Sequence, residues 1–338
     1  MASDAVAVTH QNSPSVTVYP FSAGFGTKYA DASPVVAAGG FGIHFKSDTI
    51  GFGGAGSSTV AAWPWSAGFG TRYASPATMP TGYGYGVKFS SQTSSTGDIG
   101  AASQNAPNMV AYPFTSGFGT KYADPATIPN VTCTGIAFKP DGTAVAVGAT
   151  ITPFLFVYPW ASGFGTKYAN PATLPPARIN YVAFTTADIG VVHNTTPFVS
   201  AYPFSAGIGT KYANPASLPA TNGLGVDFGL GAIAVANADA VGIYVYPWNP
   251  GFGTKYANAA STTGASRGTA FGSASIAMAL TVTPFVAGYP WSAGFGTKYG
   301  NPATLPAGTG YKVGFHNPAV AAAKRIYLSA MSGIEQPL

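Results

Sequence analysis

Charged side chains are scarce in this sequence. Only 7% of its 338 residues are Asp, Glu, Lys or Arg, against about 25% in an ordinary globular protein. The 15 basic and 10 acidic residues give a formal net charge of +5, and no basic run is longer than Lys324-Arg325. Because nucleic-acid binding requires a dense basic stripe, the sequence predicts no nucleic-acid partner.

Cysteine, signal sequences and long apolar runs are also scarce or missing. Cys133 is the only cysteine, which excludes an internal disulfide and predicts a small buried side chain. The first residues lack the basic start and apolar core of a secretory signal peptide. No apolar stretch approaches the about 18 residues of a membrane span. We therefore expect synthesis in the cytoplasm and no insertion into a membrane.

Groups that carry acid–base or metal chemistry are few and scattered. None of the four histidines pairs locally with another histidine or a carboxylate at the spacing of metal ligands. His10 and His193 fall at equivalent strand ends of distant repeats. Asp98, Asp141 and Asp188 fall near the same turn of different repeats, which is typical of turn residues. The sequence therefore predicts no catalytic residues, no metal site and no cofactor.

A twelve-residue motif is present in seven nearly identical copies. The first copy reads YPFSAGFGTKYA and the fourth reads YPWASGFGTKYA. The copies begin at Tyr19, Trp63, Tyr112, Tyr158, Tyr202, Tyr246 and Tyr289. They define repeats 1 to 7, with spacings of 43 to 49 residues. A period of this length with several strands per repeat is typical of β-propeller blades.

Repeat 4 shows the expected order of strands most clearly. Its predicted strands are TGIAF (134–138), AVAVGA (144–149), PFLFVYP (153–159) and a short fourth strand TKYA (166–169). Lys139-Pro140-Asp141-Gly142 predicts a hairpin turn between the first two strands, and SGFG (162–165) reverses the chain within the motif. We therefore predict an all-β fold, a seven-bladed β-propeller of four-stranded blades.

Two positions of the motif have predicted structural roles. Proline at its second position cannot donate to a strand ladder and should end the third strand. The aromatic residue at its third position, Phe or Trp, should pack between neighbouring blades.

The two ends of the chain are predicted to share one blade. AVAVTH (5–10) and SVTVYP (15–20) match second and third strands, and YKVGF (311–315) would supply the first. RIYLSAM (325–331) competes for the same place, but it matches the other repeats less well. We therefore predict a propeller domain at 1–315 and a C-terminal arm at 316–338. The candidate anchoring residues of the arm are Lys324, Arg325, Ile326, Tyr327 and Leu328.

Two stretches of repeat 4 resemble known repeat proteins. AFKPDGTAVAV (137–147) resembles the repeat of WD40 and YVTN-type β-propellers. The longer run YPWASGFGTKYANPATLP (158–175) is similar to WD40-like repeats encoded by bacteriophages. The resemblance extends to about residue 315, and it implies a seven-bladed propeller of phage origin. The Gly-His and Trp-Asp pairs of eukaryotic WD40 proteins are absent.

A basic residue followed by tyrosine recurs at one position of every motif copy. The basic residues are Lys28, Arg72, Lys121, Lys167, Lys211, Lys255 and Lys298. The tyrosines are Tyr29, Tyr73, Tyr122, Tyr168, Tyr212, Tyr256 and Tyr299. This Lys/Tyr ring has two interpretations. It is a multivalent surface for a glycan or an anionic partner, or its basic residues protect the outer strands from edge-to-edge aggregation.

These features together predict a non-enzymatic bacteriophage virion protein. It would decorate the head or form part of the tail or its fibres, as a rigid scaffold that binds other virion proteins of the capsid or tail. The alternative is a lectin-like propeller that binds a host-surface glycan or receptor. An enzyme such as a lactonase is a third alternative, and one tightly bound divalent metal ion would favour it.

Overall fold

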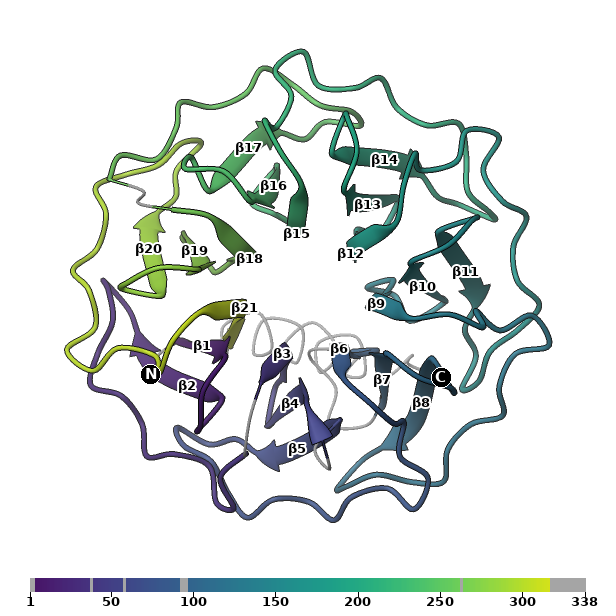
Figure 1. Ribbon diagram of the computed structural model, residues 1–338, viewed down its shortest axis with the longest axis horizontal. Coiled ribbons are helices and arrows are strands. Elements are labelled where there is room, and N and C mark those ends of the chain that lie inside the picture. Colours follow the sequence, from purple (N-terminus) through teal and green to yellow (C-terminus); the bar gives the residue numbers. More distant parts are fainter. Residues whose placement is uncertain (1–3, 37–38, 57–58, 92–96, 262–263, 317–338) are drawn as a thin grey trace, which may run out of the picture.

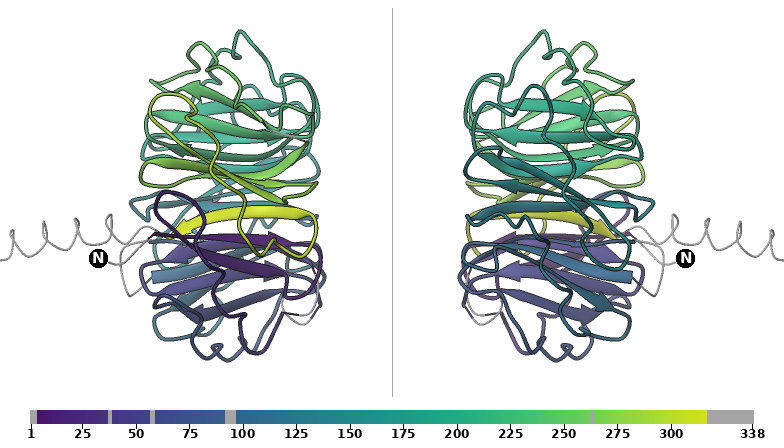
Figure 2. Two further views of the ribbon diagram at one scale, coloured as in Figure 1. Left: turned by 90° about the vertical axis from the view of Figure 1, so that its left-hand side faces the viewer. Right: turned by 90° about the vertical axis from the view of Figure 1, so that its right-hand side faces the viewer.

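The described part of the chain is built from β-strands. The computed structural model describes residues 4–36, 39–56, 59–91, 97–261 and 264–316. These residues contain no α-helix and form seven three-stranded antiparallel sheets. Figure 1 shows the sheets arranged around a common centre. Figure 2 shows the strands running across the thickness of this ring.

Six of the sheets consist of three consecutive strands each. The innermost strands are β3 (Gly40–Lys46), β6 (Gly84–Phe89), β9 (Cys133–Phe138), β12 (Ile179–Phe184), β15 (Gly223–Gly229) and β18 (Ser266–Phe271). The middle strands are β4 (Thr49–Gly54), β7 (Gly97–Ser103), β10 (Ala144–Ala149), β13 (Asp188–His193), β16 (Ala232–Asn237) and β19 (Ser275–Leu280). The outer strands are β5 (Val60–Pro64), β8 (Met109–Phe114), β11 (Leu155–Pro159), β14 (Val199–Pro203), β17 (Ile243–Pro247) and β20 (Val286–Pro290).

The remaining sheet joins the two ends of the described chain. β1 (Asp4–His10) pairs with β2 (Val16–Phe21) on one side and with β21 (Gly310–His316) on the other. This is the pairing predicted for 5–10, 15–20 and 311–315. His316, which we predicted to begin the arm, is the last residue of β21 and lies opposite Ala5. The rest of the predicted arm, with its five anchoring residues, lies outside the described residues.

The apolar core lies between neighbouring sheets. One cluster of buried side chains, for example, combines Met109 and Ala111 of repeat 3 with Ile136 and Val147 of repeat 4. The middle strands are buried along most of their length because a sheet covers each of their faces. Cys133 belongs to the same cluster, and burial raises the pKa of its thiol to about 12. The predicted burial of this cysteine is confirmed.

The predicted fourth strand is not confirmed. Residues 166–169 form no strand, and one backbone bond ties them to β11, from Tyr168 N–H to the Val157 carbonyl at 2.9 Å. Every repeat makes the equivalent bond, at 2.9 to 3.0 Å. The tight turn explains the missing ladder. Gly163 has φ of +147° and Pro159 has no N–H to donate, so the returning chain bonds β11 only at Gly165, whose N–H donates to the Pro159 carbonyl at 2.9 Å, and at Tyr168.

Candidate functional site

The tyrosines of the Lys/Tyr ring lie in the junctions between neighbouring sheets. Each meets the third-position aromatic of the next repeat edge-on, with ring centroids 5.1 to 5.4 Å apart. The pairs are Tyr29–Trp65, Tyr73–Phe114, Tyr122–Trp160, Tyr168–Phe204, Tyr212–Trp248, Tyr256–Trp291 and Tyr299–Phe21. The last pair joins repeat 7 to repeat 1. The predicted packing of the third-position aromatic between neighbouring sheets is thus confirmed.

Two junctions carry an additional carboxylate. Asp98 accepts hydrogen bonds from the Tyr122 hydroxyl at 2.7 Å and from Trp160 Nε1 at 2.9 Å. The equivalent bonds of Asp188 come from Tyr212 at 2.8 Å and Trp248 at 3.0 Å. Because tyrosine and tryptophan belong to successive repeats, each carboxylate ties two sheets together.

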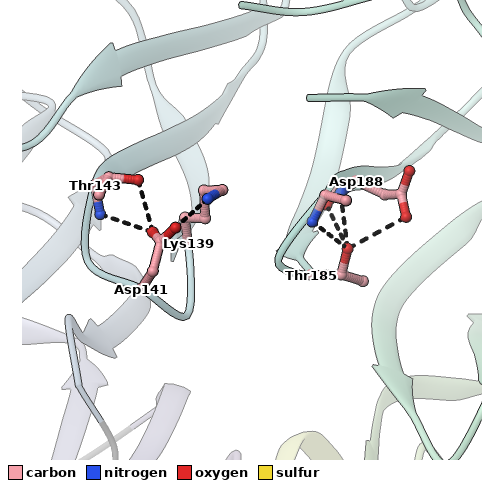
Figure 3. Close-up of polar contacts among 6 residues, drawn as sticks. Lys139, Asp141, Thr143, Thr185 and Asp188 are labelled. Carbon is pink, nitrogen blue, oxygen red and sulfur yellow. Dashed lines mark hydrogen bonds and ion pairs between the residues drawn. The ribbon is translucent and has the colours of Figure 1, made fainter. Parts of the chain in front are cut away.

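Polar side chains also close the first hairpin of repeats 4 and 5 (Figure 3). Asp141 accepts from Lys139 Nζ, and from the backbone N–H and hydroxyl of Thr143 at 3.0 and 2.6 Å. Burial raises the pKa of Asp141, but these hydrogen bonds outweigh it and lower the pKa to about 2. In the next repeat, the Thr185 hydroxyl accepts from the Asp188 backbone N–H at 2.7 Å. The contacts of Asp141 fit the predicted turn role, whereas the carboxylates of Asp98 and Asp188 accept hydrogen bonds at the junctions instead.

The basic residues of the Lys/Tyr ring tether the segment that follows them. Lys167 Nζ donates to Asn170 Oδ1 at 2.6 Å and to the Tyr168 carbonyl at 3.0 Å. The same contact three residues ahead joins Lys28–Asp31, Arg72–Ser75, Lys121–Asp124, Lys211–Asn214, Lys255–Asn258 and Lys298–Asn301. All seven basic side chains remain half-buried. The structure therefore gives the ring a local structural role, and its binding role stays a prediction.

Each of the seven innermost strands contacts two others, and we call the space that these strands face the central channel. Five of them carry glycine at their third residue, namely Gly42, Gly86, Gly135, Gly225 and Gly268. A Cβ on Gly268 would lie 2.8 Å from the Cα of Lys312 on the adjacent strand. Glycine at this position therefore allows the close approach of neighbouring strands.

The other two innermost strands place large side chains at this position. They are Tyr181 on β12 and Lys312 on β21, two strands on opposite sides of the centre in Figure 1. Lys312 Nζ lies 4.1 Å from the centroid of the Tyr181 ring. It also donates to the carbonyls of Leu224 at 2.7 Å and Arg267 at 2.9 Å. Burial, with the positive charges of Arg267 and Lys88, lowers the pKa of Lys312 to about 7.

A cavity of about 360 Å³ occupies the end of the channel where the innermost strands begin. The second residue of each innermost strand lines it: Phe41, Tyr85, Thr134, Asn180, Leu224, Arg267 and Tyr311. Thr132, Thr150, Arg178 and Lys312 complete the lining. We call this the mouth cavity. Three cations face it, and no Asp or Glu of the described residues lines it.

A second cavity of about 240 Å³ lies beyond Lys312, which lines both cavities. Its lining also includes Tyr181, His44, Lys88 and Asp227. Burial raises the pKa of Asp227 and lowers that of Lys88, and each opposes the shift of the other. Asp227 Oδ2 accepts the Phe271 backbone N–H at 2.9 Å. His44 Nδ1 accepts the Phe89 N–H at 3.1 Å, and burial keeps its imidazole neutral by lowering its pKa.

The channel residues were missed from the sequence. Their signal lay in the alignment of the first strands, whose second residue differs among repeats that share a nearly identical twelve-residue motif. Across the residues that the structure describes, no three His, Cys, Asp or Glu side chains form a group that could hold a metal ion. That part of the chain also has no helix long and apolar enough to cross a membrane.

Among the comparisons with known proteins, only the comparison with solved structures identifies the fold. No protein-family model matches the chain, and no curated protein matches it in sequence. Among solved structures, a candidate 6-phosphogluconolactonase of Bacteroides fragilis is 11% identical, with a TM-score of 0.71 over 94% of this chain and 98% of that one. A second such protein, of Bacteroides uniformis, is 12% identical, with a TM-score of 0.65 over 94% and 100%.

The β-propeller domain of Cps50 (Swd1) from Myceliophteria thermophila is also similar. It is 12% identical, with a TM-score of 0.60 over 82% of this chain and 90% of that one. The chain has a β-propeller fold. At these identities the likeness extends to the fold and not to activity.

Proposed function

We propose that the chain is a closed seven-bladed β-propeller of the WD40-like type encoded by bacteriophages. The pairing of β21 with β1 supports closure, because it places both ends of the described chain in one sheet. The Tyr299–Phe21 contact supports it as well, because it repeats the geometry of the other six junctions. A closed ring leaves few open strand edges, which protects it from edge-to-edge association.

Within a phage particle, this ring would act as a non-enzymatic scaffold of the head, tail or fibres that binds other virion proteins. The observation that carries the proposal is the repeated junction, which gives a rigid body with seven similar outer surfaces. Repeated surfaces allow a scaffold to bind its partners at several points, so that weak contacts add. The resemblance of the repeats to phage-encoded repeats supports a place in a phage particle.

Immunogold labelling of purified phage particles, with antibody against this chain, tests the proposal. Gold at one fixed place on the head or tail is the expected result. Intact and gently disrupted particles that both lack the protein, by labelling and by mass spectrometry, would contradict it. An unrelated host protein of similar abundance serves as the control for carry-over.

The Lys/Tyr ring favours a second candidate, a propeller that binds host-surface glycans or receptors. Every repeat presents one half-buried basic residue at the same position. Weak contacts between these residues and a multivalent partner would add through avidity. The triple variant Lys167→Gln, Lys211→Gln and Lys255→Gln should lose binding to host envelopes. Unchanged binding by this variant would refute the role of the ring.

A further inference from the structure

The mouth cavity combines fixed positive charge with aromatic walls and hydroxyl groups. We propose that it binds a small organic anion, a carboxylate or phosphate group carried on a hydroxylated body about the size of a monosaccharide. This inference concerns the channel alone and holds whether or not the chain is part of a virion.

No Asp or Glu of the described residues lines the mouth cavity beside its basic residues. Arg178, Arg267 and Lys312 line it, and the four ion pairs among the described residues join other lysines to aspartates. Arginine stays charged at every pH relevant here, and its planar guanidinium matches the oxygens of a carboxylate or phosphate. A bound anion would therefore neutralise cations that have no carboxylate partner.

The cations are also held in place before a ligand arrives. Arg178 donates to Asn180 Oδ1 from Nε at 3.2 Å and from a terminal nitrogen at 3.1 Å. Asn180 is anchored in turn, because its Nδ2 donates to the Gly223 carbonyl at 2.7 Å. The guanidinium of Arg267 lies 5.0 Å from the centroid of the Tyr311 ring. Binding to such preorganised groups costs less conformational entropy than binding to mobile side chains.

The remaining walls suit the body of the ligand. Phe41 lies against Tyr311 and Tyr85, with ring centroids 4.8 and 5.6 Å apart, and forms an apolar wall with them. The Thr134 hydroxyl donates to the Ile179 carbonyl at 2.6 Å, so its oxygen can accept a hydrogen bond from a ligand hydroxyl. The volume of about 360 Å³ lies in the lower part of the range of small-molecule sites.

The charge state of Lys312 adds a signature that depends on pH. The groups that face it from neighbouring elements are Arg267 on β18, Lys88 on β6 and Tyr181 on β12, with Asp227 and His44 in the cavity beyond. The pKa of Lys312 is about 7, and a bound anion would raise it because the anion favours the charged ammonium. By linkage, affinity should stay constant below pH 7 and fall as the pH rises above 7.

Isothermal titration calorimetry on the full chain tests the site with four probes. Glucuronate and glucose 6-phosphate carry the anion on a sugar body, glucose carries the body alone, and inorganic phosphate carries the charge alone. We expect glucuronate or glucose 6-phosphate to bind more tightly than about 1 mM, and the better of the two identifies the anionic group. Glucose and inorganic phosphate should each bind at least about tenfold more weakly.

Three variants locate the binding. Arg178→Gln and Arg267→Gln should each weaken the better probe by about tenfold, with an unchanged melting temperature because both side chains are exposed. Lys312→Gln should abolish the pH dependence, measured with glucuronate because a carboxylate stays ionised in this window. Lys139→Gln removes a positive charge from a hairpin turn outside the cavity and should leave the affinity unchanged.

Three results would overturn the proposal. The first is that neither sugar anion binds, and the second is that glucose or inorganic phosphate binds as tightly as both of them. The third is that the two arginine variants bind as tightly as the unmodified chain.

Discussion

The outer junctions and the central channel follow opposite rules in the same seven repeats. At the junctions, every repeat places a tyrosine against the aromatic ring of the next repeat. At the mouth cavity, the seven equivalent positions carry Phe, Tyr, Thr, Asn, Leu, Arg and Tyr. A ring needs identical junctions in order to close, whereas a binding site for an asymmetric molecule needs different groups on different sides. Repetition thus serves the fold, and departure from repetition indicates the site.

Removal of one junction aromatic should have the largest effect on stability. Trp160 is 5% exposed and packs against Phe164, Phe138 and Tyr122, with centroids 4.9 to 5.3 Å apart. Trp160→Ala should lower the free energy of unfolding by about 3–5 kcal/mol, measured by urea denaturation. Trp160→Phe, which restores the residue used in repeats 1, 3 and 5, should recover most of this loss. An alanine variant as stable as the parent chain would show that the junctions do not stabilise the ring.

Folding stability and anion binding in the channel should depend on pH in different ranges. The pH dependence of stability should come from two buried histidines. Burial lowers the pKa of His10 and of His193 to about 4, below the value of about 6.5 in an unfolded chain. Between these values the unfolded state binds more protons, so stability is full above pH 6.5 and falls as the pH drops toward 4.

Each histidine should contribute a loss of about 3 kcal/mol over this range. His193→Asn should make the decline less steep, as measured by urea denaturation at pH 7 and pH 4.5. An equal decline in this variant would contradict the assignment. Anion binding should instead change above pH 7, where Lys312 loses its proton.

The carboxylate of one junction should have an intermediate effect. Asp98→Ala leaves the Tyr122 hydroxyl and Trp160 Nε1 without their acceptor, which should cost about 2 kcal/mol. The junction between repeats 6 and 7 offers a natural comparison. Ala232 stands at the equivalent strand position there, and Trp291 Nε1 has no hydrogen-bond partner. The measurement is the melting temperature, and Asp98→Asn should lose less than Asp98→Ala because it keeps an acceptor.

Substitution of a single basic residue of the Lys/Tyr ring should have the smallest effect on stability. Lys298 holds Asn301 with one hydrogen bond at 2.5 Å in a half-buried position. Lys298→Gln should change the free energy of unfolding by less than about 1 kcal/mol. A loss as large as that of Trp160→Ala would mean that the contacts of these basic residues, rather than the aromatic junctions, hold the seven sheets together.

The strands and junctions could be predicted because their signals are local. The middle strand of repeat 4 spans the predicted residues 144–149, since an apolar run between two turns leaves little choice of boundary. The fourth strand could not be judged locally. Thr166 and Tyr168 favour a strand, but the turn that precedes them decides how much of the ladder residues 166–169 can reach.

The sequence by itself determined the seven repeats, the strand order and the aromatic residues of the junctions, because each can be inferred from a pattern that recurs in every repeat. Only the tertiary structure decided which side chains meet at the centre. Lys312 reaches Tyr181, Leu224 and Arg267 from a strand that enters the ring at the far end of the chain. No local pattern encodes that meeting, because it exists only once all the sheets have taken their places around one axis.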